Sequence, residues 1–329
     1  MIYPWQQTIW QQLTAAFMNN TLPHAMLFSG IQGIGKLSFV QTLTRYLLCE
    51  KRSKLAGFCD NTADLCHACH LIETNVHPSV YYIEPDKAGH AIKIDQIREM
   101  TEYAGQSAYL GEYQCIIIHP AHQLNHFAAN ALLKTLEEPA NNVFLFLITD
   151  ERSRLLATIN SRCMHVAMPM PTRDEASSWM VQHSKHTTAE LSLALNLAMG
   201  APLRALALLQ STNWKTRGLV YQTIEHFITG QTSLLSSATL LQDVDLQEVL
   251  DYLLSWCADA AKLKCGVEMA HIDNADYAKP LAVFAQMKSL SAIDQALHSI
   301  FSIRKKVLAG VSLNKTLCIE NILLTMERC

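Results

Sequence analysis

Three glycines and a lysine form the stretch of this chain that is best suited to chemistry. Gly30, Gly33, Gly35 and Lys36 follow an apolar run typical of a buried strand, and a pattern of helical period comes after them. Glycines allow successive backbone N–H groups to turn inward onto an anion, and a helix start adds its positive dipole end. Lys36 can then reach the outer phosphates of a nucleotide. The spacing therefore predicts a phosphate-binding loop.

The residues that hold Mg²⁺ in nucleotide hydrolases are missing from this chain. The position after the lysine should carry a Ser or Thr hydroxyl, but it is Leu37. Ser38 comes one residue late, so on a helix it points about 100° away from the metal position. The acids expected after the apolar run that ends at Ile118 are replaced by His119 and Pro120, and neither is a hard oxygen ligand. We expect a loop that can hold ATP or ADP without hydrolysing it.

Four cysteines make a second candidate site. Cys66 and Cys69 form a C-x-x-C pair, whose spacing lets two thiolates reach one tetrahedral ion. Cys49 and Cys59 precede them in a polar segment with too few apolar residues to pack by itself. We therefore predict a structural Zn²⁺ in an insert over residues 49–69.

Two alternatives to the four-cysteine site are open from the sequence. His67 and His70 lie within the same segment and are also suitable zinc ligands. The plainer interpretation makes Cys49 an ordinary buried thiol at a helix end and leaves the other cysteines exposed and free. Metal content distinguishes the zinc site from the free thiols.

The composition indicates a globular protein without a strongly basic surface. Of the 329 residues, 50% are hydrophobic and 17% are charged, and the formal net charge is -3. Strong non-specific binding to nucleic acid scales with Lys and Arg placed on phosphates, so this acidity argues against it. No apolar run approaches the roughly 20 residues that span a bilayer, and the N-terminus lacks a signal-peptide pattern. We expect a cytoplasmic protein with no membrane partner, whose ten cysteines are reduced or bind metal.

Strand-like and helix-like segments alternate over the first half of the chain. Besides the run before the phosphate loop, short apolar runs typical of buried strands occupy residues 79–83, 114–118, 143–148 and 164–167. Apolar side chains at helical spacing separate them. This alternation predicts a mainly parallel α/β sheet with helices on both faces, and the second half is helical almost throughout.

Three segments together resemble the AAA+ subunits of DNA polymerase clamp loaders. They are residues 22–25 (LPHA), 128–139 (AANALLKTLEEP) and 161–163 (SRC), of which the last two are specific in combination. The resemblance is strongest over residues 1–210. Because the Mg²⁺ ligands are absent and a cysteine insert is present, the chain is most similar to a non-motor subunit.

The resemblance implies a fold class of α/β plus all-α with three domains. Residues 1–168 would form an AAA+ nucleotide-binding-like P-loop domain that carries the cysteine insert. Residues 169–211 would form a small helical lid, and residues 212–329 a helical collar that joins the subunits into a ring. The implied partners are the motor (gamma/tau) and delta subunits and, through the complex, the sliding clamp and primed DNA.

The resemblance also assigns roles to three polar residues. Arg162 would be an arginine finger that acts in trans and reaches the γ-phosphate of ATP held by the adjacent motor subunit, since a guanidinium is planar and permanently charged. Thr149 matches the position that senses the γ-phosphate, and Arg204 matches a second sensing arginine. The plainer interpretation of Arg162 is a surface arginine paired with a carboxylate, and that of Arg204 is a charge on a helix surface.

The resulting hypothesis is a non-motor subunit that supports ATP-dependent loading of a sliding clamp on primed DNA in chromosomal replication. It would belong to a DNA polymerase holoenzyme without ATPase or polymerase activity of its own. One alternative is a self-sufficient AAA+ ATPase, a motor of a clamp loader or a DNA-repair complex, but Leu37 and His119 argue against it. The other is a zinc-stabilised nucleotide sensor outside replication, which leaves the triplet at residues 161–163 unexplained.

Overall fold

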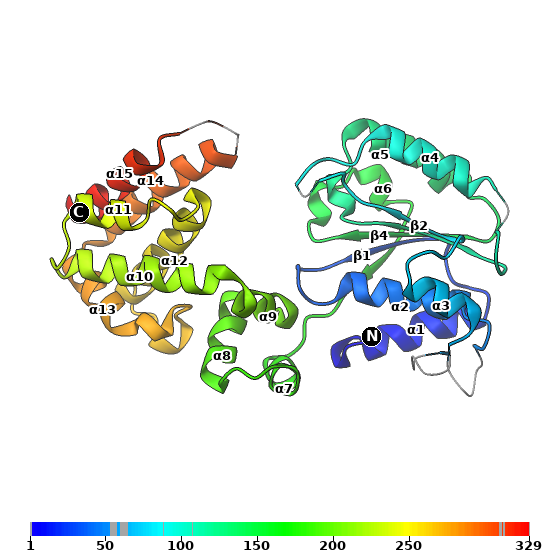
Figure 1. The fold of residues 1–329 in the computed structure, drawn as a ribbon, viewed down its shortest axis with the longest axis horizontal. Coiled ribbons are helices and arrows are strands. Elements are labelled where there is room, and N and C mark those ends of the chain that lie inside the picture. Colours follow the sequence, from blue (N-terminus) through cyan, green and yellow to red (C-terminus); the bar gives the residue numbers. More distant parts are fainter. Residues whose placement is uncertain are drawn as a thin grey trace. The chain divides into compact units, whose positions relative to one another are not determined.

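Five parallel strands organise the first part of the chain (Figure 1). The computed structural model describes residues 2–52, 58–59, 65–87, 89–106, 108–308, 311 and 313–328. The chain divides into two compact units, Met1–Ala176 and Ser177–Cys329. Residues 53–57 and 60–64 of the predicted insert lie outside the described residues. The finer division into domains at residues 168 and 211 stays a prediction.

The sheet has the order β2-β3-β4-β1-β5, and every neighbouring pair of strands is parallel. Its strands are β1 (Ala25–Ser29), β2 (Val80–Ile83), β3 (Gln114–Ile118), β4 (Val143–Thr149) and β5 (Met164–Ala167). All residues of β3 and β4 are buried, as continuous apolar runs require when helices cover both faces of a sheet. The predicted parallel α/β sheet is confirmed.

Helices cover both faces of the sheet (Figure 1). On one side lie α4 (Ile94–Ala104), α5 (His126–Glu137) and α6 (Ala157–Asn160), and on the other α1 (Gln7–Met18), α2 (Lys36–Leu48) and α3 (His67–Glu73). Short 3₁₀ turns occupy η1 (Pro4–Gln6), η3 (Ala121–Gln123) and η4 (Arg152–Arg154). Phe28 packs against Phe39 of α2 and Phe146 of β4, with ring centroids 5.9 and 6.0 Å away, so aromatic side chains fill the α2 side.

The register of the central strands determines which loops meet. Ser29, the last residue of β1, is the partner of Thr149, the last residue of β4. The phosphate loop follows β1 directly, so it lies beside the residues that follow β4. Ligands of open parallel sheets bind at this carboxyl edge.

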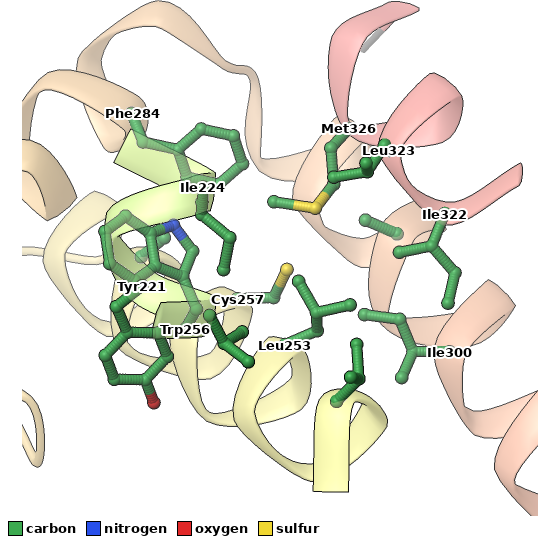
Figure 2. Packing of buried hydrophobic residues seen from close by; sticks show 14 of the residues in the cluster. Tyr221, Ile224, Leu253, Trp256, Cys257, Phe284, Ile300, Ile322, Leu323 and Met326 are labelled. Carbon is green, nitrogen blue, oxygen red and sulfur yellow. The ribbon is translucent and has the colours of Figure 1, made fainter. Parts of the chain in front are cut away.

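The remaining described residues are helical apart from turns and loops. The helices are α7 (Arg173–His183), α8 (Thr188–Leu197), α9 (Pro202–Gln210), α10 (Thr212–Ile228), α11 (Leu234–Leu240), α12 (Leu246–Lys264), η5 (Met269–His271), η6 (Ala275–Tyr277), α13 (Ala278–Met287), α14 (Leu290–Leu308) and α15 (Lys315–Arg328). Their core is centred on α12, where Leu253, Trp256 and Cys257 are fully buried among side chains of α10, α13, α14 and α15 (Figure 2). The predicted helical second half is confirmed.

Two apolar residues of these helices do not belong to this core. Phe301 is 56% exposed and Leu219 is 39% exposed. Phe301 follows the fully buried Ile300, and one residue along a helix turns the side chain by about 100°, away from the core.

Among the described helices, none alone is long and apolar enough to cross a membrane. Helices α8 and α9 pass that test only as a pair bent by 112°.

Removing the buried side chain of Leu253 is expected to destabilise the helical unit strongly. Leu253→Ala should lower the free energy of unfolding by about 2–5 kcal/mol, because it removes buried apolar contacts and leaves a cavity. Leu235, which is 66% exposed, provides the matched control, and Leu235→Ala should change it by less than about 0.5 kcal/mol. Urea titration followed by circular dichroism measures both, and equal effects would contradict the described core.

Candidate functional site

The phosphate loop joins α2 at Gly35, where any other residue would strain the backbone. Gly35 caps the N-terminus of α2 with φ +89°, a left-handed conformation that side chains rarely adopt. A Cβ atom at this position would also overlap the ring of Tyr3. The N-terminal segment of the chain is therefore packed directly on the loop.

Lys36 is turned inward and all three N–H groups of its ammonium have acceptors. The Nζ atom donates to the carbonyl oxygens of Gly30 and Ile31 at 2.8 and 2.6 Å, and it forms an ion pair with Asp150 at 2.6 Å. The Lys36 side chain is only 4% exposed. Burial lowers the pKa of Lys36, and the carboxylate of Asp150 opposes that shift. In this arrangement the lysine already holds an anion supplied by its own chain.

The first residues of the chain cover the outer side of the phosphate loop. The Nε1 atom of Trp5 donates to the carbonyl oxygen of Ile34 at 3.0 Å. The side-chain amide of Gln6 donates to the carbonyl oxygens of Ile34 and Gly35 at 2.9 and 3.2 Å, and Gln6 is fully buried. These bonds tie the N-terminal turn η1 to the phosphate loop.

Thr149 is buried at the end of β4 and bonds within its own loop. Its Oγ1 atom accepts from the backbone N–H of Glu151 at 3.1 Å and lies 3.2 Å from Nδ1 of His122. His119 follows β3, and burial lowers its pKa. The Nδ1 atom of His119 has no hydrogen-bond partner among the described residues. The γ-phosphate-sensing role of Thr149 stays a prediction, and Asp150 is the residue at this edge that the sequence did not indicate.

Arg162 lies at the surface and is held by a carboxylate. Its Nε and Nη2 atoms contact Oε1 of Glu137 at 2.9 and 2.5 Å, and Nη1 donates to the carbonyl oxygen of Thr158 at 3.0 Å. The side chain of Arg162 is 34% exposed and that of Glu137 is 52% exposed. The plainer interpretation, a surface arginine paired with a carboxylate, thus describes Arg162 in the isolated chain. Glu137 was not identified as its partner, although it belongs to the LEEP segment that carried the resemblance.

Arg204 lies on α9 in the second unit and is exposed. It lines a cavity of about 620 Å³ between α8 and α9 on one side and α10, α12 and α14 on the other. Arg217, Asp251 and Arg304 line the same cavity, and these three side chains are already ion-paired. The role of Arg204 in sensing nucleotide stays a prediction.

The four predicted cysteines meet in one buried cluster. The sulfur atoms of Cys49, Cys59, Cys66 and Cys69 all lie within 4.8 Å of one another. Cys49 Sγ lies 3.6 Å from Cys59 Sγ and 3.9 Å from Cys66 Sγ. A disulfide needs about 2.05 Å. Tetrahedral zinc with Zn–S bonds of about 2.3 Å separates its sulfur ligands by about 3.8 Å, so the observed spacing fits a metal ion.

The surroundings of the cluster favour the thiolate form of Cys66 over the neutral thiol. Burial alone would raise the pKa of Cys66, but the backbone N–H of Cys69, which lies 3.5 Å from its sulfur, helps lower the pKa to about 7. Burial raises the pKa of Cys69. The alternative ligands His67 and His70 are exposed and lie outside the cluster.

An aromatic cluster fixes the cysteine site to the body of the first unit. The ring of Phe58 packs against Trp10 of α1 and Tyr46 of α2, with both centroid distances at 5.6 Å. Trp10 and Tyr46 also contact each other at 5.5 Å. The segment that carries Cys59 is thus attached to the same two helices that adjoin the phosphate loop.

The strand order, the phosphate loop after β1 and the helices beyond β5 define a P-loop protein of the AAA+ class. A family model described as DNA polymerase III, delta subunit, matches residues 5–172, and the model of the C-terminal part of that subunit matches residues 211–328. The chain is 32% identical to DNA polymerase III subunit delta′ of Escherichia coli, over 99% of this chain and 95% of that protein. It is 31% identical to the Pseudomonas aeruginosa subunit, over 98% and 96%. The chain therefore belongs to the delta′ subunits of DNA polymerase III, and the predicted clamp-loader family is confirmed.

Removing Asp150 is expected to destabilise the first unit because it leaves the Lys36 ammonium buried without its counter-ion. Asp150→Ala should lower the free energy of unfolding by about 2–4 kcal/mol. The exposed pair of Asp86 and Lys93 provides the control, and Asp86→Ala should change the free energy of unfolding little, because water screens that pair. Urea titration measures both variants, and a loss at position 150 no larger than that at position 86 would contradict the buried ion pair.

Proposed function

We propose that this chain is the non-hydrolysing subunit of a DNA polymerase clamp loader and presents Arg162 to ATP bound by the adjacent motor subunit. The observation that carries the proposal is a contrast between two cations. Lys36 is 4% exposed and fully engaged by its own chain, whereas Arg162 is 34% exposed at the surface. The cation that would serve this chain's own nucleotide site is closed off, and the one that would serve a neighbour is accessible.

The nucleotide chemistry of the isolated chain follows from the same contacts. A phosphate that enters the loop has to displace Asp150 from Lys36 and separate the loop from the cover formed by Trp5 and Gln6. ATP or ADP binding therefore works against interactions that already satisfy the loop. Hydrolysis also lacks a Mg²⁺ ligand, because Leu37 stands where a hydroxyl is needed.

To bind a phosphate, Arg162 has to exchange the carboxylate of Glu137 for phosphate oxygens as its acceptors. Glu137 holds the guanidinium through Nε and Nη2, which is the edge that also binds a phosphate in a bidentate manner. An exposed ion pair contributes only about 0–1 kcal/mol, so this exchange is inexpensive. The bond from Nη1 to Thr158 keeps the side chain in place during the exchange.

Arg162→Ala is expected to lower ATP hydrolysis by the reconstituted loader while its assembly stays intact. An arginine finger accelerates phosphoryl transfer by roughly 10³-fold or more, so the ATP site that faces this chain should lose nearly all of its turnover. Arg98→Ala, which removes an exposed arginine paired with Asp95, is the matched control. Steady-state hydrolysis and native mass spectrometry report the two properties, and an unchanged turnover number would rule out the finger.

We further propose that the four cysteines hold a structural Zn²⁺. The buried sulfur atoms have the mutual spacing that a tetrahedral ion requires. When bound, zinc would cross-link two segments that have few apolar residues of their own.

The chain would be an assembly component with the gamma/tau and delta subunits as partners, acting on the sliding clamp and primed DNA through the complex. A cytoplasmic location stays a prediction.

Metal analysis of the chelator-washed protein is expected to give one zinc per chain. Cys66→Ser should abolish it, because a serine hydroxyl stays protonated and replaces a thiolate poorly. Cys265→Ser is the matched control, since Cys265 is exposed and outside the cluster, and it should retain the metal. Plasma mass spectrometry measures the content, and wild-type protein without stoichiometric zinc would refute the site.

A further inference from the structure

Arg45 is a half-buried cation next to the four-cysteine cluster. It lies in the last turn of α2, four residues before Cys49, so both positions lie on one side of the helix end. Its side chain also interacts with the sulfur of Cys69, which belongs to α3. Arg45 thus approaches the cluster from the helix that begins at the phosphate loop.

Two of the three nitrogen atoms of this side chain lack an acceptor within the described part of the chain. Both Nε and Nη2 of Arg45 are buried, and neither has a hydrogen-bond partner among the described residues. N–H groups of a guanidinium that are buried without acceptors are unfavourable, because they have lost their hydration. Such a group requires a compensating negative charge nearby.

Bound zinc would supply that charge. Each cysteine ligand loses its proton on binding, so four thiolates and one Zn²⁺ carry two net negative charges. Those charges would be buried, since all four residues are at most 8% exposed: Cys49, Cys59, Cys66 and Cys69. A second positive group is needed to offset this desolvated charge, and sulfur ligands commonly accept hydrogen bonds from such groups around a metal.

We infer that Arg45 is a charge-balancing residue of the zinc site, which neutralises part of the anionic cluster and donates hydrogen bonds to its sulfur atoms. It acts through the thiolates and does not bind the metal. The inference rests on the proposed zinc site and adds to it a residue outside the cysteine segment. It also explains why two buried nitrogen atoms of Arg45 lie beside four thiols without an acceptor of their own among the described residues.

The test compares zinc retention in full-length variants. Zn²⁺-loaded wild type, Arg45→Leu and Arg45→Lys are mixed with the chelating dye 4-(2-pyridylazo)resorcinol, and zinc transfer is followed by absorbance. Arg45→Leu is expected to weaken zinc affinity about 10- to 100-fold, as loss of a partner of the metal ligands does. Arg45→Lys should fall between the two, because it keeps the charge without the planar donor edge.

Arg52→Leu is the matched control from the same segment. The guanidinium of Arg52 lies over the rings of Phe17 and Tyr113, at 4.9 and 5.7 Å from their centroids. This control should retain zinc like the wild type. If Arg45→Leu fails to fold, Arg45→Gln keeps N–H donors without the charge and should still weaken binding.

Cobalt substitution separates charge balance from a lost ligand. Co²⁺-loaded Arg45→Leu should keep the absorption bands of tetrahedral four-thiolate coordination, whereas disruption of the cluster would change them. Equal zinc retention in wild type and Arg45→Leu would overturn the role of Arg45 and leave the zinc site standing. Wild-type protein that binds neither metal would instead refute the zinc site itself.

Discussion

The ion pair between Lys36 and Asp150 is the interaction on which the nucleotide-loop region of this chain depends. Parallel pairing sets it up, because the register of Ser29 with Thr149 places the residues after β1 and β4 at the same edge. At that edge a buried ammonium meets a carboxylate of its own chain and two loop carbonyl oxygens. The ammonium of Lys36 is consequently fully paired within its own chain.

The exposed arginine is the opposite case within the same unit. Arg162 is held by Glu137 in a pair open to water, so the partner is replaceable at small cost. In the proposed function, the buried Lys36 belongs to this chain's own nucleotide site and the exposed Arg162 acts on a neighbour's.

The sheet and the cysteine cluster were predictable from sequence, whereas the counter-ions were not. Continuous apolar runs such as β3 and β4 identify strands buried on both faces, and a C-x-x-C pair identifies thiols that meet. Asp150, Glu137 and Arg45 are single charged residues whose neighbours in sequence say nothing of their partners. Phe301 shows the same limit for apolar residues, because helical spacing alone did not reveal which face is covered.

The helix α2 is anchored by side chains at both of its ends. Its first residue is Lys36, locked into the phosphate loop, and its last turn carries Arg45 and leads into Cys49 of the thiol cluster. Helix α2 has 13 residues and is about 20 Å long. It cannot slide along its axis or rotate without breaking one of these two attachments. If the proposed zinc binds at Cys49, its ligation is thermodynamically linked to the rigidity of the loop at the other end of α2.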